Sequence, residues 1–286
     1  MQELTHYING AHVAGASGRF SNVYNPATGE VQAKVPLASA DEMAQAVEIA
    51  AAAQVAWGAV NPQRRARVMM KFVDLLNRDM DALAEALSRE HGKTLPDAQG
   101  DVQRGLEVVE YCIGAPQMLK GDFTDSAGPG IDMYSMRQAL GVCAGITPFN
   151  FPAMIPMWMF APAIVCGNAF ILKPSERDPS VPLMLAELME EAGLPKGVLQ
   201  VVNGDKEAVD AILDHDVIQL EVQPIVVVRL WSFQCSQSIP NELSISHHIQ
   251  YLASLHLAFV IQICHHLFPT IERILSPLFA LGARTL

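Results

Sequence analysis

Apolar residues recur every three to four positions through residues 40–118, the spacing that places side chains on one face of an α-helix. A capping-box pattern from Ser39 to Glu42 predicts where the first helix begins. Three more helices are predicted after residue 61, from about residue 81 to the stop signal His91-Gly92, and over residues 97–118. Ala44, Val47, Ala51 and Val55 are predicted to lie on one face of the first helix.

Short apolar runs and amphipathic segments alternate after residue 140. Strands are predicted over residues 140–146, 169–172 and 198–202, and helices over residues 153–165, 182–192 and 206–213. This alternation is typical of βαβ units with a parallel sheet, which binds ligands at the carboxyl ends of its strands.

Two segments outside this alternation are predicted to be extended. Residues 7–34 combine short strand-like runs with turn signals such as Asn-Gly. Residues 123–140 predict a hairpin that is broken at Gly128-Pro129-Gly130. The chain is therefore expected to be of the α/β class.

Charge and cysteine content limit the classes of partner and compartment. The 286 residues carry a net charge of -11, which argues against nucleic acid or an anionic membrane surface as a partner. The five cysteines form no C-x-x-C pair, so we expect a reducing compartment without a disulfide framework or zinc site. The first residues contain no secretory signal or Arg-rich transit peptide, and the cytoplasm is the predicted location. No metal is expected, because adjacent histidines such as His247-His248 and His265-His266 point in different directions on a helix.

The composition changes abruptly after Glu221. Residues 1–221 carry a charge of 16 minus 28, or -12, whereas residues 222–286 carry +1 and contain no Lys and no Asp. A shifted reading frame or gene-model error, a helical addition, and a membrane-associating segment are the three interpretations of this tail. Its longest apolar stretch, residues 251–264, is short for a membrane span, which needs about 20 residues.

Asn150 follows the strand at residues 140–146 and lies between apolar and proline residues. We expect these neighbours, Pro148, Phe149, Phe151 and Pro152, to shield its side chain from water. A shielded amide N–H could stabilise the oxyanion that forms when a nucleophile attacks a carbonyl. The alternative is a turn asparagine that satisfies its own backbone.

Lys173 and Glu176 follow the next strand, so they are expected at the same sheet edge as residues 147–150. Such a pair can hydrogen-bond the vicinal hydroxyls of an adenosine ribose, and the carboxylate would repel a 2′-phosphate and favour NAD over NADP. A solvated surface salt bridge is the alternative. The usual G-x-G-x-x-G fingerprint does not follow the first strand of this unit.

The cysteines of the first 221 residues are predicted to be packing residues rather than nucleophiles. Cys143 and Cys166 stand in apolar strand and helix contexts, and Cys112 lies on a predicted helix. A catalytic cysteine must be accessible and have a stabilised thiolate.

Residues 1–220 resemble the N-terminal part of the aldehyde dehydrogenase superfamily, and within it the CoA-acylating branch that acts on methylmalonate semialdehyde. The stretches that carry the resemblance are YINGAHVAG, YNPATGEV, SREHGKTLPDAQGDVQRGLEVVEY, AGPGIDMYSMRQALGV, GITPFNFPAMIPMWMFAPAIVCGNAFILKPSERDPS and GLPKGVLQVVNGDKEAVDAIL. Ordinary members of the superfamily usually have Trp where this chain has Phe149, which favours the acylating branch.

The resemblance implies a role for six residues. Asn150 matches the oxyanion-stabilising asparagine, and Thr147 and Phe149 match positions that line the nicotinamide nucleotide. Lys173 and Glu176 match the pair that holds the adenosine ribose, and Arg177 matches a further nucleotide contact of the acylating branch. The implied reaction is attack of a Cys thiolate on an aldehyde, hydride transfer to NAD, and transfer of the acyl group to coenzyme A.

The sequence departs from the family after residue 218. The Gly-Ser/Thr turn over the pyrophosphate and the Gly-Gln-x-Cys setting of the nucleophile are both missing from it. We therefore expect an incomplete aldehyde-dehydrogenase-like fold, with N-terminal helices, a partial Rossmann-type sheet over residues 1–221, an oligomerisation-like hairpin at residues 123–140 and a helical or disordered tail over residues 222–286.

Two functions are consistent with this pattern. The first is NAD-dependent, CoA-acylating oxidation of methylmalonate or malonate semialdehyde, in valine or inositol catabolism, by a homo-oligomer in the cytoplasm or, by family, the mitochondrial matrix. The second is a truncated, non-catalytic chain that binds nucleotide weakly or associates with a full-length partner.

Overall fold

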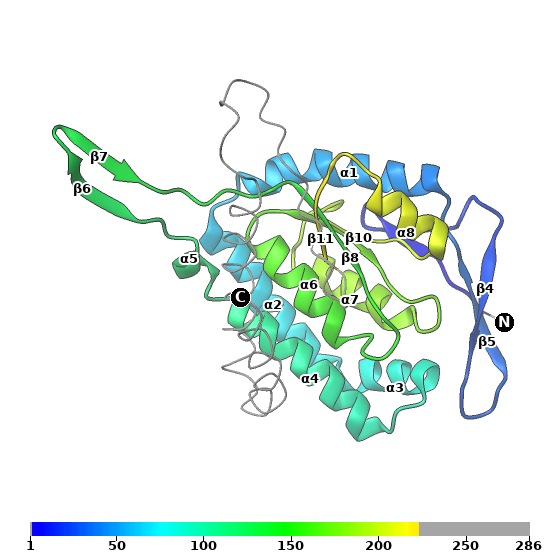
Figure 1. Cartoon of the computed structure of the whole chain (residues 1–286). Helices are drawn as coiled ribbons and strands as arrows, with labels where there is room; N and C mark the ends of the chain where they lie inside the picture. The colour runs from blue at the N-terminus through cyan, green and yellow to red at the C-terminus, as the bar shows by residue number, and fades with distance from the viewer. Residues whose placement is uncertain (1, 223–286) are drawn as a thin grey trace, which may run out of the picture. The chain divides into compact units, whose positions relative to one another are not determined.

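The computed structural model describes residues 2–222, which form the elements labelled in Figure 1. The expectation of a helical or disordered tail over residues 222–286 lies outside the described residues, apart from the backbone of Val222.

A six-stranded sheet forms the centre of the described chain. Four strands are parallel neighbours, and the predicted βαβ alternation is thereby confirmed. Two N-terminal strands extend the sheet in the antiparallel sense, which the sequence pattern did not predict. In spatial order the strands are β11 (Ile218–Val222), β8 (Val142–Ile146), β9 (Ala169–Lys173), β10 (Leu199–Val201), β2 (His6–Ile8) and β3 (Ala11–Val13).

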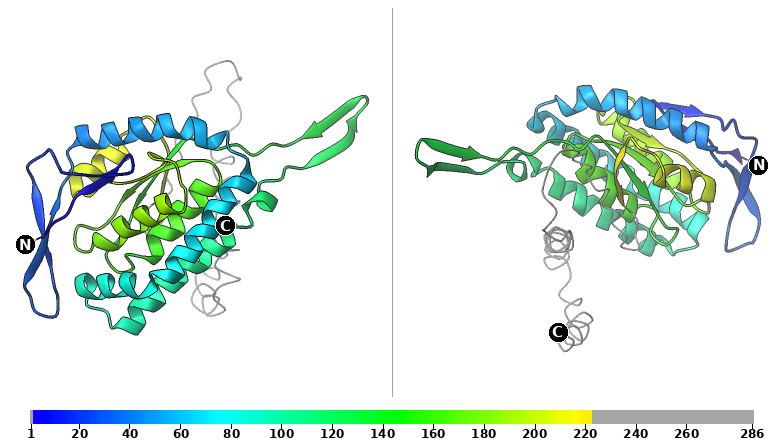
Figure 2. Two further views of the ribbon diagram at one scale, coloured as in Figure 1. Left: turned by 180° about the vertical axis from the view of Figure 1, so that it is seen from behind. Right: turned by 45° about the horizontal axis from the view of Figure 1, so that its top comes forward.

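The remaining strands form two smaller sheets. One has three strands, in the order β1 (Gln2–Glu3), β5 (Val31–Pro36) and β4 (Phe20–Tyr24). The other is the predicted hairpin of β6 (Phe123–Gly128) and β7 (Ile131–Tyr134), which projects away from the central sheet and its helices (Figures 1 and 2). Its large apolar side chains, among them Phe123, Ile131, Met133 and Tyr134, are exposed.

The predicted helices are confirmed with small changes in their bounds. They are α1 (Ala40–Gly58), α2 (Pro62–Arg78), α3 (Met80–His91), α4 (Leu95–Cys112), α5 (Ala115–Met118), α6 (Met154–Val165), α7 (Ser180–Glu191) and α8 (Lys206–Leu213). The capping box at Ser39 and Glu42 is formed as predicted, and Gly92 ends α3 with a φ of 84°. The single helix predicted over residues 97–118 is instead two, because α4 ends at Cys112 and α5 starts a new turn.

The helices cover the central sheet in two layers (Figure 2). On one face, Val142, Ala144 and Ile171 pack with α1 and α8. On the other, Cys143 and Phe170 pack with α2, α4, α6 and α7. Alternate residues of a strand point to opposite faces, so β8 and β9 contribute to both layers of the core.

The predicted apolar face of α1 is not its buried face: Val47 is buried, but Ala44 and Ala51 are half-buried and Val55 is 73% exposed. The buried side chains are Met43, Ala46, Val47, Ala50 and Trp57. Alanines occur all round this helix, so its pattern defines no single apolar stripe. The bulky Met43 and Trp57 determine the face, and the Trp57 indole donates a hydrogen bond to the Ile164 carbonyl at 2.8 Å.

In residues 2–222, none of the helices is by itself both long and apolar enough to cross a membrane, although α1 and α2, bent by 115° at the break between them, meet that test as a pair.

Candidate functional site

The loops that follow β8 and β9 lie side by side at one edge of the central sheet. Ile146 pairs with Lys173 in the parallel register, and the Thr147 N–H donates to the Lys173 carbonyl at 3.1 Å. The expectation that the segment from Thr147 to Asn150 and the segment from Lys173 to Arg177 share one edge is therefore confirmed.

Lys173 is held inside the fold rather than on its surface. Its side chain is buried, 5% of the residue is exposed, and Nζ donates to the Gly204 carbonyl at 2.8 Å. Glu176 Oε2 lies 3.7 Å from Nζ, and this carboxylate is partly exposed. Burial lowers the pKa of Lys173, while Glu176 acts in the opposite direction. The alternative of a solvated surface salt bridge is thus wrong for the lysine.

Phe149 and Arg177 bring the two loops together at the surface. The Arg177 guanidinium carbon lies 4.8 Å from the centroid of the Phe149 ring, a cation–π geometry. The His91 ring lies 6.5 Å from the same ring, at an interplanar angle of 31°. Phe149 is nevertheless 47% exposed, so part of its side chain is accessible to a ligand.

Asn150 lies beside these groups, but its side chain is exposed. The predicted shielding by its apolar and proline neighbours is wrong for the part of the chain that the structure describes. Those neighbours point partly elsewhere: the Phe151 ring packs under the Lys93 ammonium, 4.2 Å from its centroid. An exposed amide has a weaker electrostatic effect than a shielded one.

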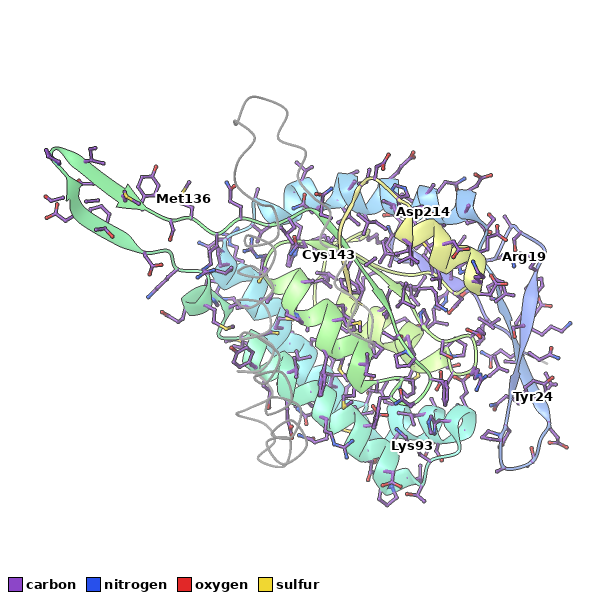
Figure 3. The ribbon with its side chains drawn as sticks, in the orientation of Figure 1. Arg19, Tyr24, Lys93, Met136, Cys143 and Asp214 are labelled. Carbon is purple, nitrogen blue, oxygen red and sulfur yellow. The ribbon has the colours of Figure 1, made fainter. Side chains whose placement is uncertain are left out.

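An ion pair between Lys93, which is labelled in Figure 3, and the buried Asp101 fixes the turn at Asn150, and the sequence pattern did not reveal it. Lys93 Nζ donates to the fully buried Asp101 at 2.7 Å and to the Asn150 carbonyl at 2.8 Å. The other carboxylate oxygen of Asp101 accepts the Met154 N–H, at the start of α6, at 2.8 Å. The pair thus connects the start of α4 to both ends of the segment from Asn150 to Met154. Lys93 lies before α4 begins at Leu95 and Asp101 lies within it, so no pattern along one helix could have paired them.

Several buried polar groups lie behind the two loops. The Thr147 hydroxyl, His91 Nδ1 and Asp178 Oδ1 have no hydrogen-bond partner within residues 2–222. Glu90 accepts hydrogen bonds from the Ser180 N–H at 3.0 Å and from its hydroxyl. Burial, together with the nearby Glu90 carboxylate, raises the pKa of Asp178 to about 8, and burial also raises the pKa of Glu90. Asp178 therefore favours the protonated form at neutral pH.

The described cysteines are not activated nucleophiles. Burial raises the pKa of Cys112 and of Cys143 to about 12 in each case, and it raises the pKa of Cys166 as well. A thiol in such a setting carries little thiolate at neutral pH. Cys235, Cys264 and the paired histidines lie outside the described residues. Within residues 2–222, His, Cys, Asp and Glu form no group of three arranged to hold a metal.

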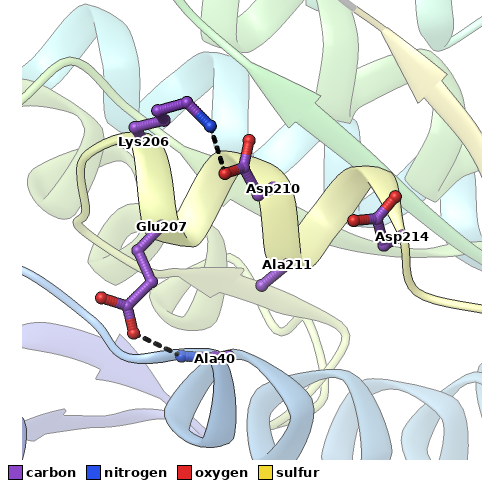
Figure 4. Close-up of a pocket in the computed structure, with 6 residues that line it drawn as sticks. All are labelled: Ala40, Lys206, Glu207, Asp210, Ala211 and Asp214. Carbon is purple, nitrogen blue, oxygen red and sulfur yellow. Dashed lines mark hydrogen bonds and ion pairs between the residues drawn. The ribbon is translucent and has the colours of Figure 1, made fainter.

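A surface pocket is present on another part of the molecule (Figure 4). It is lined by residues of α8 and by Ala40 at the start of α1. Glu207 accepts the Ala40 N–H at 3.3 Å, and Asp210 pairs with Lys206. The pocket lies beside α8 and not at the ends of β8 and β9, so we do not include it in the candidate site.

Comparison with known proteins identifies the fold. Residues 12–221 match the model of the aldehyde dehydrogenase family. The chain belongs to the aldehyde dehydrogenase family. It is 54% identical over 213 residues to a malonate-semialdehyde dehydrogenase of Pseudomonas aeruginosa, an alignment that covers 74% of this chain and 43% of the relative. It is 50% identical over 212 residues to the acylating, mitochondrial methylmalonate-semialdehyde dehydrogenase of Arabidopsis thaliana, covering 74% of this chain and 35% of that one.

Solved structures of the family match the described fold. A putative methylmalonate-semialdehyde dehydrogenase from Sinorhizobium meliloti 1021, in complex with NAD, aligns with a TM-score of 0.77 and 69% identity over 78% of this chain and 45% of that one. The methylmalonate-semialdehyde dehydrogenase of Oceanimonas doudoroffii aligns with a TM-score of 0.76 and 52% identity over 77% and 45% of the two chains. This chain thus spans less than half the length of these relatives.

Proposed function

We propose that residues 12–221 carry the adenosine-binding part of an NAD-dependent semialdehyde dehydrogenase, of the kind that oxidises malonate or methylmalonate semialdehyde. The placement of Lys173 and Glu176 at the carboxyl end of β9, beside the turn after β8, is the observation that carries this proposal. The names of the related enzymes and the NAD complex of one of them support it.

The residues at the sheet edge fit an adenosine ribose. The Lys173 ammonium has three N–H groups and uses one on the Gly204 carbonyl, which fixes its direction and leaves donors for a hydroxyl. The partly exposed Glu176 carboxylate accepts from the second hydroxyl of the ribose and repels a 2′-phosphate. NAD, when bound, accepts a hydride from the substrate. Phe149 and Arg177 present an aromatic face and a positive charge to the same ligand.

In the whole enzyme we propose that Thr147 and Phe149 line the nicotinamide nucleotide and that Asn150 donates its amide N–H to the oxyanion of the bound aldehyde. The ion pair of Lys93 and Asp101 holds the Asn150 main chain, so the side-chain amide of Asn150 extends from a fixed backbone position. The acyl group passes to coenzyme A, in valine or inositol catabolism. The hairpin of β6 and β7, with its exposed apolar side chains, contributes to a homo-oligomer. Reduced cysteines fit the cytoplasm, whereas the name of the plant relative gives a mitochondrial location.

A second proposal concerns the 286-residue chain by itself, for which we propose no dehydrogenase turnover. The observation that favours it is the state of Cys112, Cys143 and Cys166, which burial keeps as thiols. Neither Cys235 nor Cys264 stands in a Gly-Gln-x-Cys setting. Without a nucleophile, Asn150 has no oxyanion to stabilise. Such a chain binds nucleotide weakly and can associate with a full-length partner.

One pair of measurements tests both proposals. The purified chain is incubated with methylmalonate semialdehyde, NAD and coenzyme A, and NADH is followed by absorbance. We expect no NADH, and turnover within a hundredfold of about 10 per second would contradict the second proposal. Saturation-transfer NMR should detect the adenosine protons of NAD with a dissociation constant on the order of 1 mM. Absence of that signal would contradict the first proposal.

A further inference from the structure

His6 is a fully buried histidine at the start of β2. In the central sheet, β10 lies between β2 and β9, the strand that ends at the candidate site. Its Nδ1 accepts a hydrogen bond from the Asn203 N–H at 3.1 Å. The Asn203 side-chain amide donates to the Thr5 carbonyl at 2.9 Å, one position before His6. Two consecutive residues, Thr5 and His6 at the start of β2, therefore hold Asn203, almost 200 positions away in the sequence.

The turn at Asn203-Gly204 is the same turn that orients Lys173. Ala38 donates its N–H to the Asn203 carbonyl at 3.0 Å, and the Gly204 carbonyl accepts from Lys173 Nζ at 2.8 Å. A side chain at Gly204 would collide with Ala208 of α8, so the turn lies tightly against that helix. The hydrogen bond from the Asn203 N–H to His6 is thus one of the contacts that hold the turn carrying the Gly204 carbonyl.

The hydrogen bond also determines the tautomer of His6. Because Nδ1 accepts from a backbone N–H, the ring proton is on Nε2, which faces Glu42 Oε1 of α1 at 3.8 Å. A second proton would place an N–H at Nδ1 against the Asn203 N–H, and the two donors could not remain in contact. Burial lowers the pKa of His6, and the Glu42 carboxylate only partly offsets this.

The charged groups around His6 in the described chain are few. Glu42 is the one that faces the ring, and its carboxylate also accepts from the Ala16 and Ser39 N–H groups. Arg19 lies next to Glu42 and pairs with Asp205 and Glu207 at the start of α8. These groups form one network that ends at the same turn.

We infer that His6 is a positioning residue for the candidate ribose contact Lys173, because its neutral imidazole fixes the Asn203-Gly204 turn that orients the Lys173 ammonium. This inference rests on the proposed function of Lys173. It predicts that adenosine binding requires neutral His6 and weakens as this ring becomes protonated.

The test measures adenosine affinity by NMR for two variants of the full chain. His6→Leu removes the acceptor, whereas His6→Asn keeps an oxygen near the place of Nδ1. We expect His6→Leu to weaken adenosine binding on the order of fivefold, the size of one lost hydrogen bond, and His6→Asn to restore most of it. In a Lys173→Met background the His6→Leu effect should vanish. Asn61→Ala, which removes the cap of the distant helix α2, controls for lost stability and should leave affinity unchanged.

The pH profile separates positioning from a merely structural role. The wild-type affinity should stay constant down through the ordinary histidine pKa of about 6.5 and fall only at lower pH, because burial lowers the pKa of His6, while His6→Asn shows no such fall. A His6→Leu variant that folds and binds adenosine like the wild type, or an effect that persists without Lys173, would overturn the inference. If His6→Leu fails to fold, an equal pH profile in the wild type and His6→Asn overturns it.

Failure of the proposed function gives a different result. In that case the wild-type chain does not bind adenosine at any pH. The contact between Lys173 and the Gly204 carbonyl is then followed by NMR without ligand. The Lys173 side-chain methylene resonance, identified by its loss in Lys173→Met, should shift with the midpoint of the His6 ring titration. A Lys173 resonance that ignores this titration would overturn the inference.

Discussion

The ammonium group of Lys93 lies 2.8 Å from the main-chain carbonyl of Asn150, 57 positions further along the chain. The same nitrogen contacts the buried carboxylate of Asp101 at 2.7 Å. One cation therefore neutralises a buried acid and fixes the turn that carries the candidate oxyanion residue. Removing either partner of such a buried pair is strongly destabilising, because the remaining charge has no counterion.

Lys93→Met should lower the free energy of unfolding by about 3 kcal/mol, the lower end of the range for a broken buried pair. Urea unfolding measures this change. Lys206→Met is the matched control, because Lys206 is mostly exposed and pairs with Asp210 within one turn of α8. It should leave the unfolding midpoint unchanged. Equal effects of the two substitutions would show that the Lys93 pair does not stabilise the fold.

Asp178→Asn should change how stability depends on pH. The pKa of Asp178 is raised to about 8 in the fold, whereas an unfolded aspartate titrates near 3.9. Between these values the folded chain binds the extra proton, so the stabilisation is complete below about pH 4 and is lost as the pH rises towards 8. Asn mimics the protonated acid, and the variant should gain roughly 1–3 kcal/mol relative to the wild type between pH 5 and pH 8.

Thermal unfolding across this pH range checks the prediction for Asp178. Asp79→Asn is the control, because hydrogen bonding to Arg78 lowers the pKa of Asp79 and the contribution of Asp79 to stability therefore depends on pH in the opposite direction. Stability from Asp79 is present above the ordinary aspartate pKa and is lost only as the pH falls below it. An Asp178→Asn variant that tracks the wild type from pH 5 to pH 8 would contradict the assignment.

Two glycines of α4 should respond to the same substitution in opposite directions. A Cβ at Gly105 would collide with the Met157 side chain and lie 3.2 Å from the Met154 Cα of α6. Gly105→Ala should therefore destabilise by about 1–3 kcal/mol. A Cβ at Gly100 meets only the end of the Arg104 side chain at 3.8 Å, and Gly100→Ala should stabilise by up to about 1 kcal/mol. Urea unfolding that ranks the two variants in the reverse order would contradict this close helix crossing.

Much of the fold could be predicted because its signals are local. Ser39 and Glu42 lie three positions apart and cap α1, and Lys206–Leu213 has the predicted bounds. The antiparallel placement of β2 beside β10 could not be predicted, because it joins Tyr7 to Val201 and no pattern links such distant residues. Val55 was placed wrongly because an alanine-rich helix gives a weak periodicity.

The candidate site could be predicted only where it follows the strands. Thr147 follows β8 and Lys173 ends the neighbouring parallel strand β9. The predicted strand pattern was therefore enough to place both residues at one edge of the sheet. The supports of the site come from elsewhere: Lys93 and Asp101 from the region of α4, and His6 from the N-terminal strand. Their roles depend on tertiary contacts, and the exposure of Asn150 could not be read from its apolar neighbours.

Glu176→Gln should relax the discrimination between nucleotides. The Glu176 carboxylate lies at the candidate ribose site and repels a 2′-phosphate, so the wild type should bind NAD more tightly than NADP. Removing one charge at contact distance is worth about 1 kcal/mol in a solvated setting, which is about a fivefold change in the NAD-to-NADP affinity ratio. Competition between the two nucleotides in NMR binding experiments measures the ratio. Glu107 is an exposed carboxylate of α4, so Glu107→Gln should leave the ratio unchanged. An equal NAD-to-NADP affinity ratio in Glu176→Gln and the wild type would contradict the role of Glu176.

Chemical-shift mapping with adenosine tests the central claim most directly. Titration of the ¹⁵N-labelled chain should perturb the amides of residues 146–150, 173–177 and 202–206, apart from Pro148 and Pro174, which have no N–H. These segments lie at the carboxyl ends of β8, β9 and β10. Shifts confined to the pocket beside α8, or no shifts at millimolar adenosine, would contradict an adenosine site at this edge of the sheet.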